Sequence, residues 1–241
     1  MEDKLEARNS KFEIAAREPA RAAPVLVVRF RIAGDLRFLS HAETLRVFQR
    51  ACARAEVPVK YSEGFNPHPR LSLPLPRSVG VESDDEVLAV RLSEEPQDAG
   101  GMYEARVRQA LQAVLPAGIE VTGVELAGSG SFHPRSVDYL FCLRADRAAD
   151  LADRLRQRAQ VVLAGESRIV ERKLPGESKV RRIDVRPFLQ SVEAVERGVV
   201  VRCNVTAAGS IRIEEILQLL ELEREDLAAP IRRTAVEWVS T

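Results

Sequence analysis

The first half of the chain alternates between strand-like and helix-like patterns of apolar residues. β-branched or alternating runs predict strands over residues 25–32, 57–61, 87–94 and 119–126. Apolar side chains at helical spacing predict helices over residues 40–55 and 103–115. Ser40, followed three residues later by Glu43, has the sequence of a capping box at the start of the first helix. The order of these elements is β-α-β-β-α-β, which is the ferredoxin-like arrangement.

The second half has a similar pattern. Strands are predicted over residues 138–144, 168–173, 180–186, 192–196, 199–206 and 231–239, and helices over residues 148–159 and 213–222. We therefore interpret the chain as an α+β protein with two tandem ferredoxin-like (β-α-β-β-α-β) domains. They cover residues 25–130 and 131–241, follow a flexible tail over residues 1–24, and join near the glycine- and serine-rich segment 128–134. The halves share no strong sequence repeat, so a single large α+β sheet is the alternative.

One stretch between the predicted elements fits neither period: YSEGFNPHPRLSLPLPRSVG, from Tyr61 to Gly80. Each proline fixes its own φ and favours extended geometry in the residue before it. Gly64 and the Asn66-Pro67 pair favour turns. The composition predicts a stiff loop that presents side chains, because long loops in compact domains usually have a function. The alternative is that the prolines only brace a crossover.

This stretch also carries a resemblance. The segment FLSHAETLRVFQRACARAEVPVKYSEGFNPHPRLSLPLPRSVGVES, residues 38–83, resembles a bacterial family of unknown function described as radical-SAM-linked. Weaker matches follow in the same order, RKLPGESKVRRIDVRPFL at 172–189 and GSIRIEEILQLL at 209–220. The resemblance implies a radical-SAM protein as partner, either fused to this domain or made as a separate chain. It implies no activity, since the family has none established.

Composition and charge narrow the possible functions. The formal net charge is zero, which argues against a general nucleic-acid coat protein but not against a local basic groove. Cys52, Cys142 and Cys203 are far apart and give no iron–sulfur or zinc spacing, so the chain cannot itself be a radical-SAM enzyme, and we expect no metal or cofactor. No apolar run approaches the ~20 residues needed to cross a bilayer, and the N-terminus lacks an export signal. We expect a cytoplasmic protein without a membrane partner.

The first group of candidate residues combines aromatic, polar and basic side chains of the proline-rich loop with one helix terminus. We propose as binding residues Tyr61, Ser62, Gly64, Phe65, Asn66, His68 and Arg70, with His41 and His68 as candidate catalytic residues. A histidine at a helix N-terminus is placed to contact a bound anion, and an arginine binds phosphate. An exposed aromatic ring stacks on a base. The alternative is that His41 caps its own helix and His68 is a spacer between prolines.

The second group lies on a predicted basic hairpin. Its candidate binding residues are Lys173, Arg182, Asp184 and Arg186, and we expect an Asp184–Arg186 ion pair that orients the arginine. A basic hairpin suits an RNA backbone. The alternative is a solvated edge strand whose charges prevent aggregation.

Three functions follow from these features. The leading hypothesis is an accessory RNA-binding or substrate-presenting module that works with a separate radical-SAM protein in RNA modification. The second is an endoribonuclease or other acid–base enzyme that uses His41 and His68. The third is a docking scaffold that binds only protein, which the neutral net charge favours over the first. The sequence contains no nucleophile elbow, phosphate-binding loop or His-Glu-x-x-His motif, and whether the chain is an enzyme stays open.

Overall fold

The computed structural model describes residues 23–97, 101–128, 131–173, 180–196 and 198–240. Its strands are β1 (Val25–Ile32), β2 (Leu71–Ser72), β3 (Glu82–Arg91), β4 (Ile119–Ala127), β5 (Phe132–Cys142), β6 (Ile169–Lys173), β7 (Val180–Asp184), β8 (Leu189–Val195), β9 (Gly198–Asn204) and β10 (Arg232–Ser240). Its α-helices are α1 (His41–Arg54), α2 (Met102–Val114), α3 (Ala145–Ala164) and α4 (Ile213–Leu220). Three short 3-10 turns are η1 (Gly34–Phe38), η2 (Arg186–Phe188) and η3 (Arg224–Asp226).

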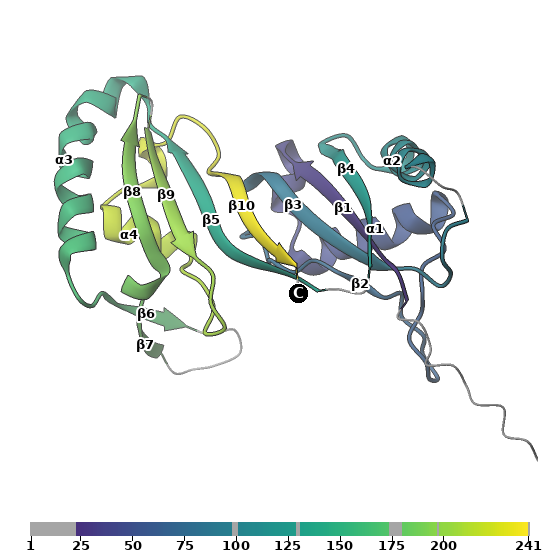
Figure 1. Ribbon diagram of the computed structural model, residues 1–241. Coiled ribbons are helices and arrows are strands. Elements are labelled where there is room, and N and C mark those ends of the chain that lie inside the picture. The colour runs from purple at the N-terminus through teal and green to yellow at the C-terminus, as the bar shows by residue number, and fades with distance from the viewer. Residues whose placement is uncertain (1–22, 98–100, 129–130, 174–179, 197, 241) are drawn as a thin grey trace, which may run out of the picture.

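The strands of both halves belong to one large mixed sheet, so the α+β class is confirmed (Figure 1). The strand order is β4-β1-β3-β10-β5-β9-β8, and β2 pairs with part of β3 outside this path. The two halves meet where β3 and β10 run parallel, with only two registered pairs, Arg232 with Glu82 and Arg233 with Ser83. A continuous sheet is the alternative that the sequence left open.

The strands of the two halves are arranged in the same order. The first half has the order β4-β1-β3-β2 and the second has β10-β5-β9-β8, and neighbours within each half are antiparallel. When the main strands of each half are numbered along the chain, both orders read 4-1-3-2. The β6–β7 hairpin forms a separate two-stranded sheet inserted between α3 and β8. The tandem ferredoxin-like description and the predicted domain boundaries stay predictions.

Each half has its own apolar core on one face of the sheet. In β1, the alternate residues Leu26, Val28 and Phe30 pack against α1 and α2, and the Phe30 and Phe48 rings have centroids 4.6 Å apart. In the second half, α3 and α4 cover the corresponding face of β5 and β9. Figure 1 shows the two helix pairs at opposite ends of the sheet.

A third, smaller apolar cluster lies on the other face of the first half. Val25, Val27 and Val87 form it, with Phe132 and Trp238 packed against them. Phe132 opens β5 and Trp238 lies near the end of β10. The second half therefore reaches across the back of the first half instead of joining it only at the strand edge.

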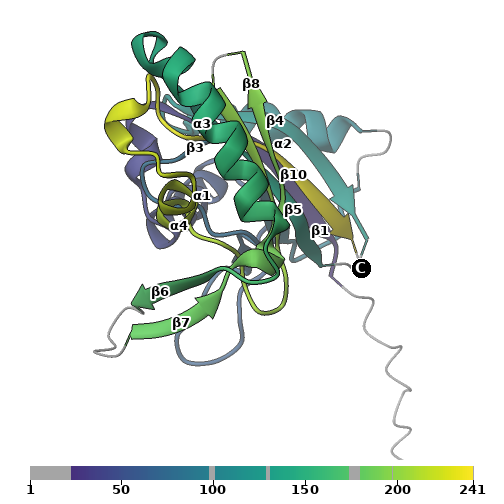
Figure 2. The ribbon, with the colours of Figure 1, turned by 90° about the vertical axis from the view of Figure 1, so that its left-hand side faces the viewer.

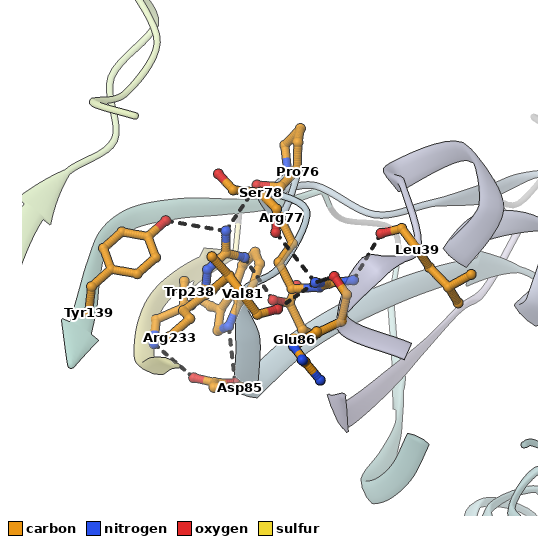
Figure 3. Close-up of polar contacts among 12 residues, drawn as sticks. Leu39, Pro76, Arg77, Ser78, Val81, Asp85, Glu86, Tyr139, Arg233 and Trp238 are labelled. Carbon is orange, nitrogen blue, oxygen red and sulfur yellow. Dashed lines mark hydrogen bonds and ion pairs between the residues drawn. The ribbon is translucent and has the colours of Figure 1, made fainter. Parts of the chain in front are cut away.

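A buried ion pair also joins the halves (Figure 3). Arg233 of β10 donates from Nη1 to the Glu86 carboxylate of β3 over 2.8 Å, and both side chains are at most 5% exposed. The same guanidinium donates to the carbonyl of Pro76 over 2.9 Å. Beside it, Asp85 accepts the backbone N–H of Val236 over 3.0 Å. Because few strand pairs connect β3 and β10, these side-chain contacts hold the two parts of the sheet together.

Most elements lie where the hydrophobic pattern predicts them, but one predicted strand is absent and another ends two residues early. Residues 57–61 form no strand, because Val59 and Tyr61 make only single bridges, to Leu92 and Pro69. The second strand of the first half is instead the short β2. The predicted strand over 180–186 ends at Asp184, because Pro187 lies in the turn η2 and cannot donate to a strand ladder.

Candidate binding surfaces

The proline-rich loop after α1 is an ordered hairpin. Ser62 N–H donates to the His68 carbonyl over 2.8 Å, and His68 N–H donates to the Ser62 hydroxyl over 2.9 Å. At its base, Lys60 N–H donates to the Arg91 carbonyl over 2.7 Å, and Arg70 N–H donates to the Lys60 carbonyl over 2.8 Å. These bonds fix both arms of the loop against the end of β3.

The tip of this loop displays an aromatic side chain. Phe65 is wholly exposed, and Tyr61 on one arm is 52% exposed. Gly64 has φ of +120°, a region that L side chains rarely adopt, so glycine allows the chain to reverse beside Phe65. Asn66 and His68 are exposed as well. The loop therefore holds polar and aromatic groups outward on a braced backbone.

The two candidate catalytic histidines lie on different elements. His41 is the first residue of α1, and the loop that carries His68 follows the other end of this 14-residue helix. A helix of that length spans about 20 Å. A pair that acts on one reacting atom must lie within hydrogen-bond reach of it. The cavity that His41 lines does not include His68, and their action as a catalytic pair stays a prediction.

His41 instead lies beside a buried polar corner. It lines a cavity of about 10 Å³ together with Arg77 and Glu86, which has room for little more than a water molecule. Its helix is capped by Ser40, whose hydroxyl accepts Glu43 N–H while the Glu43 carboxylate accepts Ser40 N–H over 2.9 Å. The predicted capping box is confirmed, and His41 is not needed to cap the helix.

Arg77, which follows the prolines of the loop segment, has a role that the sequence pattern did not indicate. Its guanidinium donates to the carbonyls of Arg37 over 2.7 Å and Leu39 over 3.1 Å, just before α1 (Figure 3). It also donates to the Val81 carbonyl. Burial lowers the pKa of Arg77. This arginine connects the end of the loop segment to the start of α1. Its position between Pro76 and β3 is the sequence feature that could have indicated this role.

Several charges in and next to the β6–β7 hairpin bind groups elsewhere in the second half. Arg172 donates to both carboxylate oxygens of Glu215 over 2.7 Å, and their side chains are 10% and 7% exposed. Arg186 donates to the carbonyls of Leu163 and Gly165, at the end of α3. Candidate binding residue Arg186 is therefore engaged in holding the helix end.

Asp184 differs from its prediction. Its Oδ1 accepts the backbone N–H of Arg168 over 2.7 Å and of Arg186 over 3.0 Å, so the contact to Arg186 is to the backbone and not to the guanidinium. These two hydrogen bonds lower the pKa of Asp184, with the bond from Arg168 the larger cause. The carboxylate fixes the turn that ends β7, because a charged acceptor binds N–H groups strongly.

Two candidate residues of the hairpin remain outward. Lys173 and Arg182 are exposed, and the strand register places Arg182 opposite Glu171. Figure 2 shows the hairpin extending away from the rest of the second half. The hairpin thus retains an exposed basic face, although an acidic residue lies within that face.

No metal or thiol chemistry is indicated within the described residues. No group of three or more His, Cys, Asp or Glu side chains there is arranged to hold a metal ion. All three cysteines are unbonded, and burial raises the pKa of the Cys52 thiol to about 12. In the described part of the chain, no helix combines the length and apolar character that crossing a membrane requires.

Comparison with known proteins identifies a family but no activity. No curated protein matches the chain significantly. A family model matches residues 26–220, which is most of the chain and covers both halves of the sheet. That match includes the proline-rich loop and the β6–β7 hairpin. The chain therefore belongs to the family described as "Uncharacterized protein conserved in bacteria (DUF2344)".

Proposed function

We propose that this protein is a non-catalytic, accessory RNA-binding module that presents an RNA substrate to another protein. The observation that carries the proposal is Phe65, a wholly exposed ring at the tip of a hydrogen-bonded loop. Bases of single-stranded RNA stack on exposed aromatic rings, and a braced loop loses little freedom on binding. Tyr61 offers a second, half-exposed ring on the same loop.

A stripe of arginines leads to this loop. Arg46, Arg50 and Arg54 are exposed and spaced by four residues on α1, so they share one face of the helix. Arg50 and Arg54 form no ion pair with any residue that the structure describes. The helix ends just before the loop. Such a stripe suits the phosphates of a strand whose bases reach the loop, because phosphate contacts position RNA and supply much of the affinity.

The proposal has three further parts. We propose a radical-SAM protein as the partner on the sequence resemblance alone. We propose a cytoplasmic location because unbonded cysteines suit a reducing compartment. We also propose that each half is a ferredoxin-like unit, which the 4-1-3-2 strand order of both halves supports.

Fluorescence anisotropy with a labelled single-stranded RNA at low salt tests the proposal. Phe65→Ala is expected to weaken binding by about 5- to 150-fold, which corresponds to ~1–3 kcal/mol for one stacked base. Phe65→Trp should restore the affinity. Val161→Ala is the matched control, because Val161 is an exposed apolar residue of α3 in the other half. The control should bind RNA as the wild type does.

The competing functions give different results in the same experiment. Absence of RNA binding at low salt would overturn the proposal, and capture of a protein partner that depends on Phe65 would then favour the docking scaffold. Discrete RNA cleavage that is lost in His68→Ala would favour the endoribonuclease. We expect binding without cleavage, because His41 begins α1 and His68 lies on the loop that follows the other end of that helix.

A further inference from the structure

A cavity of about 460 Å³ lies on the sheet face opposite α1 and α2. It forms where three segments meet: the base of the proline-rich loop with β2, the end of β3, and the start of β5. Val25 and Phe132 give it apolar walls, while Arg70, Ser72, Arg91 and His133 line it with polar groups. Both halves of the chain contribute, so the cavity exists only because β5 crosses the back of the first half.

Two arginines face each other in this cavity. Leu71 pairs with Val90, which places Arg70 opposite Arg91, and Arg91 N–H donates to the Arg70 carbonyl over 3.0 Å. Directly opposed residues of antiparallel strands have Cβ atoms about 5 Å apart, and like charges in such positions are destabilising. Both side chains are exposed at the cavity rim.

Neither guanidinium has a counter-charge among the residues that the structure describes. Within the described residues, Arg70 and Arg91 form no ion pair or side-chain hydrogen bond, and none of the residues lining the cavity is acidic. Other arginines of the same sheet are paired: Arg202 binds Asp138 and Arg232 binds Glu82. An unbalanced pair of positive charges beside a cavity indicates an anionic ligand.

The opposite wall adds two polar groups that the sequence analysis left unassigned. His133 Nε2 lies 2.8 Å from the Ser131 hydroxyl, and both residues line the cavity at the start of β5. The cavity volume falls within the range of about 300–1,000 Å³ typical of small-ligand sites. It therefore has room for more than an inorganic ion.

We propose that this cavity binds a phosphate monoester of nucleotide size, with Arg70 and Arg91 as the phosphate ligands. A monoester carries close to two negative charges at neutral pH, which balances two guanidinium groups, whereas an internal phosphodiester carries one. The apolar walls suit the sugar or base. The ligand is either a free nucleoside monophosphate or the 5′-phosphorylated end of an RNA strand. The second source rests on the proposed function and makes this cavity the place where the strand end is held.

Calorimetry on the full chain distinguishes the possible ligands. The probes are adenosine monophosphate, adenosine, and a hexauridylate RNA with either a 5′-phosphate or a 5′-hydroxyl. We expect adenosine monophosphate to bind and adenosine not to bind, and the 5′-phosphate to strengthen RNA binding about tenfold or more, as charged hydrogen bonds do. RNA that binds much more tightly than the mononucleotide indicates a strand end, and equal affinities indicate a free nucleotide.

Arg91→Gln should abolish the effect of the phosphate, and Arg70→Gln should reduce it in the same way. Arg154→Gln is the control, since Arg154 is an exposed arginine of α3. Because Arg70 and Arg91 repel one another, Arg91→Gln should keep or raise the melting temperature, so a loss of binding would not reflect unfolding.

The two proposals fail separately. If adenosine monophosphate does not bind, or binds Arg91→Gln as it binds the wild type, the phosphate site is wrong even where RNA binds through Phe65. If adenosine monophosphate binds through Arg91 but neither RNA does, the site stands and the proposed RNA binding is wrong.

Discussion

The proline-rich loop and the β6–β7 hairpin occupy the same position in their halves. Each is inserted between the first helix and the second strand, the loop between α1 and β2 and the hairpin between α3 and β8. In both views they extend from the lower side of the sheet (Figures 1 and 2). Their equivalent positions follow from the shared strand order, but their polar side chains are used differently.

The two insertions differ in whether their side chains have partners elsewhere in the protein. In the hairpin, Arg172 binds Glu215 and Arg186 binds the end of α3, so these charges fix the insertion to the second half. In the loop, backbone hydrogen bonds and prolines supply the order, and the side chains of Phe65 and Arg70 have no such partner within the described residues. A basic segment in a sequence is therefore not necessarily a binding surface, because folding can use its charges.

The largest expected effect comes from breaking the buried ion pair between the hairpin and α4. Arg172→Ala leaves the buried Glu215 carboxylate without its partner and should lower the free energy of unfolding by about 3–5 kcal/mol. Urea denaturation followed by circular dichroism measures it. Arg182→Ala on the outer face of the same hairpin is the control and should change stability by no more than about 0.5 kcal/mol. Equal effects of the two substitutions would contradict the distinction between hairpin charges that stabilise the fold and hairpin charges that face outward.

The second prediction compares an outward arginine of each insertion. Arg70→Gln should weaken RNA binding more than Arg182→Gln, because Glu171 lies opposite Arg182 and offsets its charge. For a phosphate contact to single-stranded RNA, losing one cation should reduce the slope of log affinity against log salt by about 0.7. Anisotropy titrations at several salt concentrations give both slopes. A larger loss for Arg182→Gln would make the hairpin the main RNA surface.

The sequence predicted the local elements well because their signals are local. The Ser40–Glu43 capping box and the β-branched run of β1 each specify an element within a few residues, and both are confirmed. The strand predicted at 57–61 was wrong because that segment bonds to the returning arm of its own loop and to the end of β3. A local pattern does not predict which segment a short extended segment will pair with.

The sites depended on contacts that the sequence does not encode locally. Arg233 and Glu86 are 147 residues apart, and no local pattern pairs them. The Arg70–Arg91 opposition depends on the register of the two-residue strand β2, and His133 joins them only because β5 crosses the back of the first half. Residue type identified Arg70 as a candidate, but only the fold supplied its neighbours.

The smallest expected effect concerns Asp184, whose backbone contacts end the hairpin. Its pKa is lowered in the folded protein by hydrogen bonds from the N–H groups of Arg168 and Arg186. A group with a lowered folded pKa contributes stability above its unfolded pKa, about 3.9, and that contribution is lost as pH falls through the folded pKa. Asp184→Asn keeps an oxygen acceptor but removes the charge. We therefore expect the variant to be slightly less stable than the wild type at pH 7, with the difference shrinking below about pH 4. Urea denaturation of both proteins between pH 7 and pH 3 measures this difference. A difference in stability that stays constant over this range would mean that the charge of Asp184 does not help to fix the hairpin. Asp184 would then differ from Glu215, whose charge does.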